Sequence, residues 1–167
     1  MTVSTKIDDF FIRKAEKEDI SLVLDFIKKL AAYERLSHEV VATEEQLAKY
    51  LFGEEQVAEV AIGYYRDVPV GFALYFYNFS TFLAKPGIYL EDLYVLEEQR
   101  GKGFGKSLLA YLARLAVEKD CGRLEWAVLD WNEPSIKFYK SLGANTMDEW
   151  LVNRLSGDGL VKLSEQF

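Results

Sequence analysis

Apolar residues recur at helical spacing in two long and two short segments of the chain. These segments predict helices over about residues 20–34, 43–51, 103–119 and 133–142. Polar residues that are typical N-caps stand at the start of three of them, namely Asp19, Thr43 and Asn132. Thr43 also has the spacing of a capping box, and Gly143 is placed to end the last helix.

Short β-rich runs fill much of the remaining chain. They predict strands over residues 10–13, 57–65, 68–77, 88–95 and 124–129, and a closing hairpin over 150–155 and 160–163. Residues 66–67 separate two of the runs and predict an antiparallel hairpin, whereas residues 78–87 are expected to form a loop. Because no linker or repeat appears, we expect an α/β or α+β fold in a single domain, 1–167.

The charge balance narrows the classes of ligand. The 167 residues include 20 Lys and Arg against 27 Asp and Glu, a net charge of −7, which repels nucleic-acid phosphates and favours cationic ligands. No stretch approaches the ~20 apolar residues of a membrane-spanning helix, and residues 1–9 lack the apolar core of a signal peptide. One histidine, His38, and one cysteine, Cys121, exclude an internal disulfide and both multi-cysteine and His-rich metal sites. We expect a soluble cytoplasmic protein with no metal, nucleic-acid or membrane partner.

A glycine-rich loop carries the most specific chemistry. A predicted buried strand runs into Gly101, Gly103 and Gly105, and an amphipathic helix follows directly. Alternating glycines allow successive main-chain N–H groups to converge on one anion, and a helix N-terminus adds partial positive charge and further free donors. Lys102 and Lys106 add two cations. The loop therefore predicts a diphosphate-binding site in an otherwise acidic chain.

Two common phosphate-binding motifs do not fit this loop. Residues 100–107 match the end of the P-loop pattern G-x-x-x-x-G-K-[ST], but Arg100 stands where its first glycine is required. The dinucleotide pattern G-x-G-x-x-G fails too, because Lys106 or Leu108 occupies the third glycine position. A nucleotide triphosphatase is disfavoured, and a glycine-rich turn without a ligand stays an alternative.

A third pattern fits throughout. Arg100, Gly103 and Gly105 form the signature [RQ]-x-x-G-x-[GA], which resembles the coenzyme A loop of the GCN5-related N-acetyltransferases (GNAT). Residues 12–19 are similar to the opening strand and helix cap of that family, and residues 132–144 to its second cofactor segment.

The resemblance implies a mixed, mostly antiparallel central sheet flanked by helices, acetyl-CoA as co-substrate, and a homodimer. It also implies two sets of residues that hold acetyl-CoA. They are Leu93, Tyr94, Val95, Arg100, Gly101, Lys102, Gly103, Phe104, Gly105 and Lys106, and then Asn132, Glu133, Pro134, Ser135 and Tyr139.

Acetyl transfer to an amine needs a base and an acid. An alkylamine with a pKa near ~10.4 is almost wholly protonated at pH 7, a handicap of roughly 4.6 kcal/mol for a nucleophile. Glu91 interrupts the apolar strand just before the glycine loop, so it is a candidate base as well as a candidate paired structural acid. The resemblance favours the base, and it assigns Tyr139 as the acid that protonates the leaving sulfur.

The same resemblance implies residues that contact the amine. Tyr33 and Glu34 end the first long helix and are similar to the substrate contacts of the di- and polyamine branch; Glu91 adds a carboxylate. The remaining candidates line a later strand or follow the last helix: Glu125, Trp126, Ala127 and Glu149. The family pattern has a glycine after the acid matched by Glu149, and this chain lacks it.

The sequence thus predicts an acetyl-CoA-dependent N-acetyltransferase that acts on a small cationic primary amine by direct attack in a ternary complex. Residues 133–135 resemble the spermidine/spermine enzymes, whereas residues 34–37 and 127–132 resemble the thialysine enzymes, so both substrate classes stay open. A non-catalytic acyl-CoA-binding module is the alternative of another class.

Overall fold

The computed structural model describes residues 2–167 and divides into two compact units, one up to Ala127 and one from Val128 to Phe167. The first unit holds a six-stranded sheet in sequence order. Its strands are β1 (Thr2–Ser4), β2 (Phe10–Lys14), β3 (Glu59–Tyr65), β4 (Val68–Ser80), β5 (Lys85–Val95) and β6 (Leu124–Trp126). Neighbours are antiparallel except β5 and β6, which are parallel.

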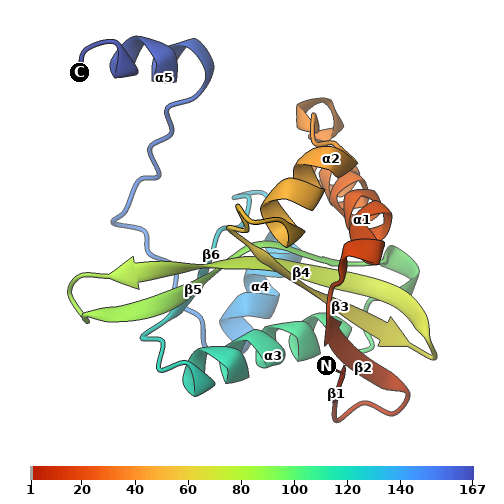
Figure 1. Cartoon of the computed structure of the whole chain (residues 1–167). Helices are drawn as coiled ribbons and strands as arrows, with labels where there is room; N and C mark the ends of the chain where they lie inside the picture. Colours follow the sequence, from red (N-terminus) through yellow and green to blue (C-terminus); the bar gives the residue numbers. More distant parts are fainter. Residues whose placement is uncertain (1) are drawn as a thin grey trace. The chain divides into compact units, whose positions relative to one another are not determined.

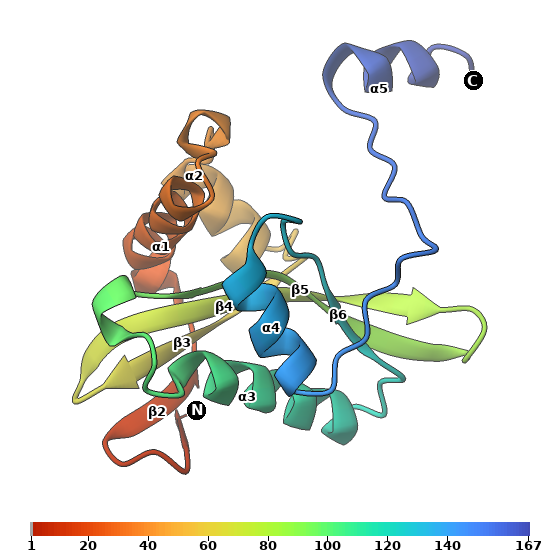
Figure 2. The same cartoon turned by 180° about the vertical axis from the view of Figure 1, so that it is seen from behind.

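Helices cover both faces of this sheet. The helices α1 (Ile20–Tyr33) and α2 (Glu44–Leu47) lie on one face, and α3 (Phe104–Glu118) lies on the other (Figure 1). The view from behind gives the same arrangement (Figure 2). The predicted mixed, mostly antiparallel sheet flanked by helices is therefore confirmed, whereas the prediction of one domain stays a prediction.

Aromatic side chains fill the core on both faces. On the α1 face, the Phe26 ring stacks on Phe72 with centroids 5.4 Å apart, and Tyr94 packs beside them. On the α3 face, Phe104 stacks on Phe10 at 4.3 Å. The apolar periodicity of α1 and α3 thus predicted which sides of these helices are buried.

An irregularity in the β4–β5 pairing decides which way two acids point. Leu74 pairs with Asp92 while Tyr75 pairs with Leu90, so Glu91 is an extra residue in β5. Strict alternation would place Leu90 and Asp92 on one face, but this β-bulge moves Asp92 to the face of α1. Leu90 stays on the face of α3.

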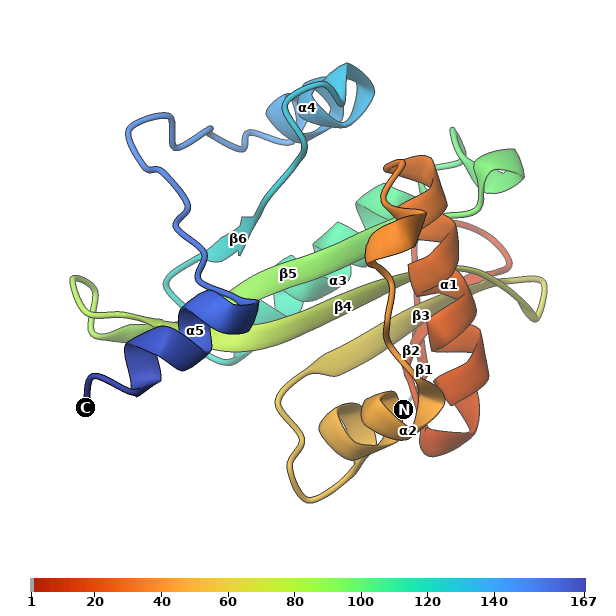
Figure 3. The same cartoon turned by 90° about the horizontal axis from the view of Figure 1, so that it is seen from above.

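The parallel strand β6 pairs with only part of β5 (Figure 3). Their pairing runs from Ile88 opposite Leu124 to Leu90 opposite Trp126. Beyond that point β5 continues to Val95, and within residues 2–167 no strand pairs with residues 91–95 on the β6 side. Apart from the Val95 oxygen, which accepts from Arg100 Nε at 3.0 Å, main-chain groups of this stretch are therefore open on one edge, shortly before the glycine loop.

Several predicted elements differ in the structure. The expected loop at 78–87 is wrong, because β4 and β5 extend toward each other until Ser80 pairs with Lys85. The strand at 124–129 ends at Trp126. The short strand β1 was not predicted, and the predicted helix over 43–51 is α2 followed by a π-helical turn, Ala48–Phe52.

Asp19 serves a purpose other than the predicted cap of α1. Its side chain makes no cap hydrogen bond to α1. Instead Arg13 Nη1 and Nη2 donate to its two carboxylate oxygens at 2.6 and 2.8 Å, and the Glu16 main-chain N–H donates at 2.8 Å. Because Arg13 is this close, the pKa of Asp19 is lowered, and the pair fixes β2 against the start of α1.

The second unit contains two helices, α4 (Glu133–Ser141) and α5 (Gly157–Ser164). Asn132 caps α4 as predicted, since its Oδ1 accepts from the Ser135 N–H at 3.4 Å. Gly143 follows with a φ of 88°. The predicted closing hairpin is wrong: residues 151–156 have no regular structure, and its second half is part of α5.

Candidate active site

The glycine loop forms a run of free donors at the start of α3. Gly101 and Gly103 have φ angles of 77° and 85°, a conformation that favours glycine. Within residues 2–167, no acceptor pairs with the main-chain N–H groups of residues 101–106, and no side chain caps α3. A Cβ at Gly101 would meet nothing within 4 Å. Such donors at a helix N-terminus suit an anion.

The side chains of this loop divide into two kinds. The Phe104 ring is buried in the core against Phe10, so only its main chain is available to a ligand. Lys102 and Lys106 are exposed, and Lys102 Nζ donates to Gln99 Oε1 at 2.7 Å. Gly105 has an ordinary backbone conformation, and a Cβ there would lie 3.7 Å from Val95 Cγ2. The loop therefore fits a diphosphate.

Arg100 holds the loop against the rest of the first unit. Its Nε donates to the main-chain oxygen of Val95 at 3.0 Å. Its guanidinium carbon lies 4.4 Å from the ring centroid of Tyr33 and 5.5 Å from that of Tyr94. The predicted cofactor residue Arg100 thus directs its side chain to two tyrosines.

A group of carboxylates lies near the end of α1. Burial, together with the negative charges of Glu91 and Glu34, raises the pKa of Asp92 to about 6. Burial also raises the pKa of Glu34. Glu91, the bulged residue, is exposed. Asp92 was not among the predicted site residues; the two adjacent acids were a signal, but the bulge that turns Asp92 rather than Glu91 inward was not predictable.

The raised pKa of Asp92 has a consequence for stability. A group whose folded pKa lies above its unfolded value contributes stability below the unfolded pKa and loses it as the pH rises through the folded value. Here the range runs from 3.8 to about 6. We therefore expect Asp92→Asn to raise the free energy of unfolding by about 2–3 kcal/mol at pH 7.5. At pH 4 we expect almost no change.

Urea denaturation at the two pH values measures this difference. Glu91→Gln is the control, because it removes a neighbouring negative charge and leaves Asp92 in place. It should raise the free energy of unfolding by only part of the amount expected for Asp92→Asn. An Asp92→Asn protein no more stable than wild type at pH 7.5 would contradict the burial of a charged carboxylate.

The other predicted residues of the first unit fall into two places. Leu93, Tyr94 and Val95 lie on the open stretch of β5, before the loop. Glu125 lies on β6, where its carboxylate pairs with Arg123 at 2.8 Å and accepts from Asn78 at 3.0 Å. Trp126 ends β6 and Ala127 follows it. Glu125 thus already has partners, and its predicted contact with the amine is untested.

The second unit carries the remaining predicted residues. Glu133, Pro134 and Ser135 form the first turn of α4, and Tyr139 stands later in the same helix. Glu149 lies in the irregular chain after α4. The predicted roles of these residues stay predictions.

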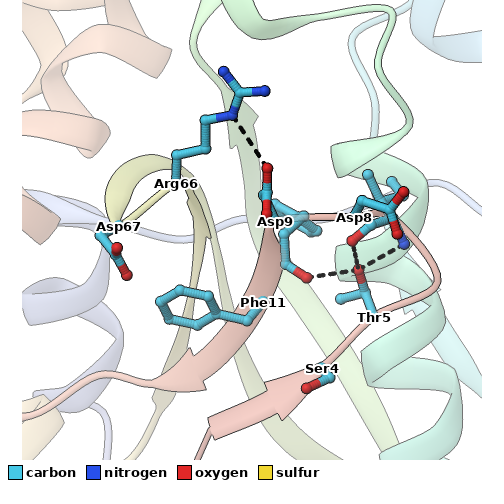
Figure 4. A pocket seen from close by; sticks show the side chains of 9 residues that line it. Ser4, Thr5, Asp8, Asp9, Phe11, Arg66 and Asp67 are labelled. Atoms are coloured by element: carbon cyan, nitrogen blue, oxygen red, sulfur yellow. Dashed lines mark hydrogen bonds and ion pairs between the residues drawn. The ribbon is translucent and has the colours of Figure 1, made fainter.

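A separate hollow of about 440 Å³ lies beside the turn between β1 and β2 (Figure 4). Its lining residues include Asp8, Asp9 and Asp67, and Arg66 Nε pairs with Asp9 at 3.2 Å. Thr5 Oγ1 donates to the Phe10 main-chain oxygen at 2.8 Å. None of the predicted site residues lines this hollow.

Two further properties concern membranes and metals. Of the helices within residues 2–167, none is long and apolar enough to cross a membrane. The same part of the chain has no group of three or more His, Cys, Asp or Glu side chains that is arranged to hold a metal ion.

Comparisons with known proteins agree with this geometry. The model of the acetyltransferase (GNAT) family matches residues 25–144. The chain is 36% identical to a thialysine N-epsilon-acetyltransferase of Bos taurus, over 92% of this chain and 96% of the relative. It is 34% identical to an L-ornithine N5-acetyltransferase of Arabidopsis thaliana, over 89% and 85% of the two chains.

A solved structure is similar over almost the whole length. It is an integron cassette protein from the mobile metagenome of V. cholerae, with a TM-score of 0.79 and 34% identity, covering 94% of this chain and 98% of the other. The glycine loop, the fold and these relatives lead to one assignment: the chain belongs to the GNAT family of acetyltransferases and is an N-acetyltransferase.

Proposed function

We propose that the protein transfers the acetyl group of acetyl-CoA to a terminal primary amine of a small cationic substrate. The observation that carries the proposal is the run of free N–H donors at residues 101–106. One 3-10 turn, Glu97–Gln99, separates it from the strand that bears the carboxylates Glu91 and Asp92. An anion site and an amine-attracting site thus stand at neighbouring points of one strand and loop.

The glycine loop supports acetyl-CoA as the donor. Main-chain N–H groups of residues 101–106 would hold the pyrophosphate, with Lys106 adding charge. Main-chain groups on the open edge of β5 at residues 93–95, other than the Val95 oxygen that Arg100 occupies, would pair with the pantetheine arm. The second segment, Asn132, Glu133, Pro134 and Ser135, would complete the binding. Acetyl-CoA supplies an activated thioester there, and no metal is needed.

The carboxylates supply what the amine needs. Their negative charge attracts the ammonium form, and one of them takes its proton before attack. We propose Glu91 as this base. Asp92, the next residue, adds a second carboxylate. A pKa of about 6 makes Asp92 a second acceptor suited to neutral pH, because proton transfer is most efficient when the pKa of the catalyst lies near the working pH.

The end of α1 supports a cationic substrate that has a second polar end. Glu34 offers a carboxylate and Tyr33 an aromatic face. We propose that Tyr139 donates a proton to the leaving sulfur. The amine site would be lined by four further residues, Glu125, Trp126, Ala127 and Glu149. Thialysine and ornithine, which appear in the names of the two relatives, both end in a primary amine. The sequence motifs also support spermidine.

A panel of amines tests the proposal. We expect acetyl-CoA to be consumed with at least one of thialysine, ornithine, spermidine and putrescine. The kcat/KM for that amine should exceed the kcat/KM for a peptide N-terminus by at least about tenfold, because the peptide lacks the charged contacts that a small cationic amine makes. Product masses identify the acetylated nitrogen. Acetyl-CoA binding without turnover of any amine would instead support a non-catalytic acyl-CoA-binding module.

We also propose that the protein acts as a homodimer, as the resemblance to the family implies, and that it does so in the cytoplasm, as its composition suggests. The negative charge of the chain supports a cationic small molecule over nucleic acid as its partner. Light scattering of the purified chain measures the oligomeric state.

A further inference from the structure

We infer that Arg100 is a positioning residue that couples acetyl-CoA binding at the glycine loop to amine binding at the end of α1, an inference that rests on the proposed function. The family signature accounts for Arg100 as part of the cofactor loop, but its side chain reaches another element. Coupling between two ligands needs a physical connection that both sites influence. Arg100 provides it within the first unit.

The contacts of Arg100 join three elements. Its main chain belongs to the glycine loop, its Nε donates to β5 at the Val95 oxygen, and its guanidinium stacks on Tyr33 at the end of α1. Tyr94 of β5 contributes a second aromatic face at 5.5 Å. A planar guanidinium donates and stacks at the same time, which a lysine ammonium does not do.

The amine side of this connection is stiff. Tyr33 is the last residue of α1, and Glu34 follows it with its N–H donating to Leu30 at 2.9 Å. Arg35 then takes a φ of 63°, and the Leu36 N–H donates back to Ala31 at 2.8 Å. These bonds end the helix tightly. A force on the Tyr33 ring therefore also moves the Glu34 carboxylate.

The cofactor side is the loop whose N–H groups have no partners within residues 2–167. A diphosphate that takes these donors pulls on the loop at Arg100, and the stacked guanidinium passes this displacement to Tyr33 and Glu34, which move together. The ligand that binds first then bears the cost of placing the shared element, so the second binds more tightly. By thermodynamic linkage each ligand strengthens the other by the same factor.

Calorimetry tests the coupling without turnover. The probes are coenzyme A, which carries no acetyl group, and whichever of thialysine, ornithine, spermidine and putrescine has the highest kcat/KM in the panel. In the wild-type protein we expect saturating coenzyme A to lower the Kd of the amine by about fivefold or more, and the amine to lower the Kd of coenzyme A equally. In Arg100→Lys we expect each ligand to change the Kd of the other by less than about twofold.

Matched variants separate positioning from general damage. Tyr33→Leu removes the stacking partner on α1 and should abolish the coupling, and adding it to Arg100→Lys should change the coupling no further. Tyr33→Phe keeps the ring and should keep the coupling. Arg66→Lys is the control, because Arg66 likewise stacks on a tyrosine, Tyr65 at 5.1 Å, and pairs with Asp9 outside the site.

Each outcome decides the question. Wild-type binding of both ligands with no mutual effect, or an Arg100→Lys protein that keeps the wild-type factor, overturns the inference and leaves the proposed function standing. A wild-type protein that binds no coenzyme A overturns both. Loss of coupling in Arg100→Lys and Tyr33→Leu, with Arg66→Lys and Tyr33→Phe unchanged, supports the inference.

Discussion

We expect Gly105→Glu to lower the affinity for acetyl-CoA by at least about 100-fold, roughly 2.7 kcal/mol, while the protein stays folded. The new carboxylate would stand among the N–H donors of residues 101–106 and repel the pyrophosphate. Two like charges about 4 Å apart near a protein surface cost several kcal/mol, which is enough to account for the expected loss of affinity. Titration calorimetry with acetyl-CoA measures it.

The same substitution should not disturb the fold. Gly105 has an ordinary φ, and a Cβ there makes normal contact with Val95. An acidic residue in the first turn of a helix is also favourable. Ala110→Glu is the matched control, since Ala110 is exposed and lies in the same helix. Equal affinities of the two variants would show that the anion binds elsewhere.

The second large effect concerns the proton that the leaving sulfur takes. We expect Tyr139→Phe to lower kcat by about 100-fold, the usual contribution of a general acid, and to leave the Kd of acetyl-CoA within about threefold. The substitution removes one hydroxyl and keeps the ring that packs in α4. Single-turnover rates at saturating acetyl-CoA measure the chemical step apart from product release.

Tyr50→Phe provides the comparison for this experiment. Tyr50 is 41% exposed and belongs to the π-helical turn after α2, away from every predicted catalytic residue in sequence. It should keep the wild-type rate. A Tyr139→Phe protein with unchanged kcat would remove Tyr139 from the reaction and leave the sulfur to be protonated by another group.

The strand, loop and helix at the centre of the site were predictable because their signals are local. The apolar run of β5, the alternating glycines and the periodicity of α3 each depend on neighbouring residues alone. The cap at Asn132 is local in the same way. The identity of the fold followed from the order of these motifs.

The inward orientation of the half-buried Asp92 was not predictable, because it depends on a pairing across strands. Alternation alone leaves open whether Glu91 or Asp92 turns inward. The extra residue between the pairs Leu74–Asp92 and Tyr75–Leu90 settles it, and a register is a property of two strands together.

The two wrong elements have separate causes. The loop prediction for residues 78–87 missed that Phe79 continues the alternation of aromatics from Tyr77, where the predicted strand ended; such residues suit a strand once a partner is present. Near the C-terminus, the short apolar runs are ambiguous between strand and helix. Ser156 precedes Leu160 and Leu163, which recur at helical spacing, and the structure forms α5 there.

A crystal structure of the protein with acetyl-CoA tests the central claim most directly. We expect pyrophosphate oxygens within ~3 Å of several main-chain nitrogens of residues 101–106, the distance of an N–H···O hydrogen bond. A pyrophosphate bound at any other part of the chain, with these N–H groups facing water, would contradict the account.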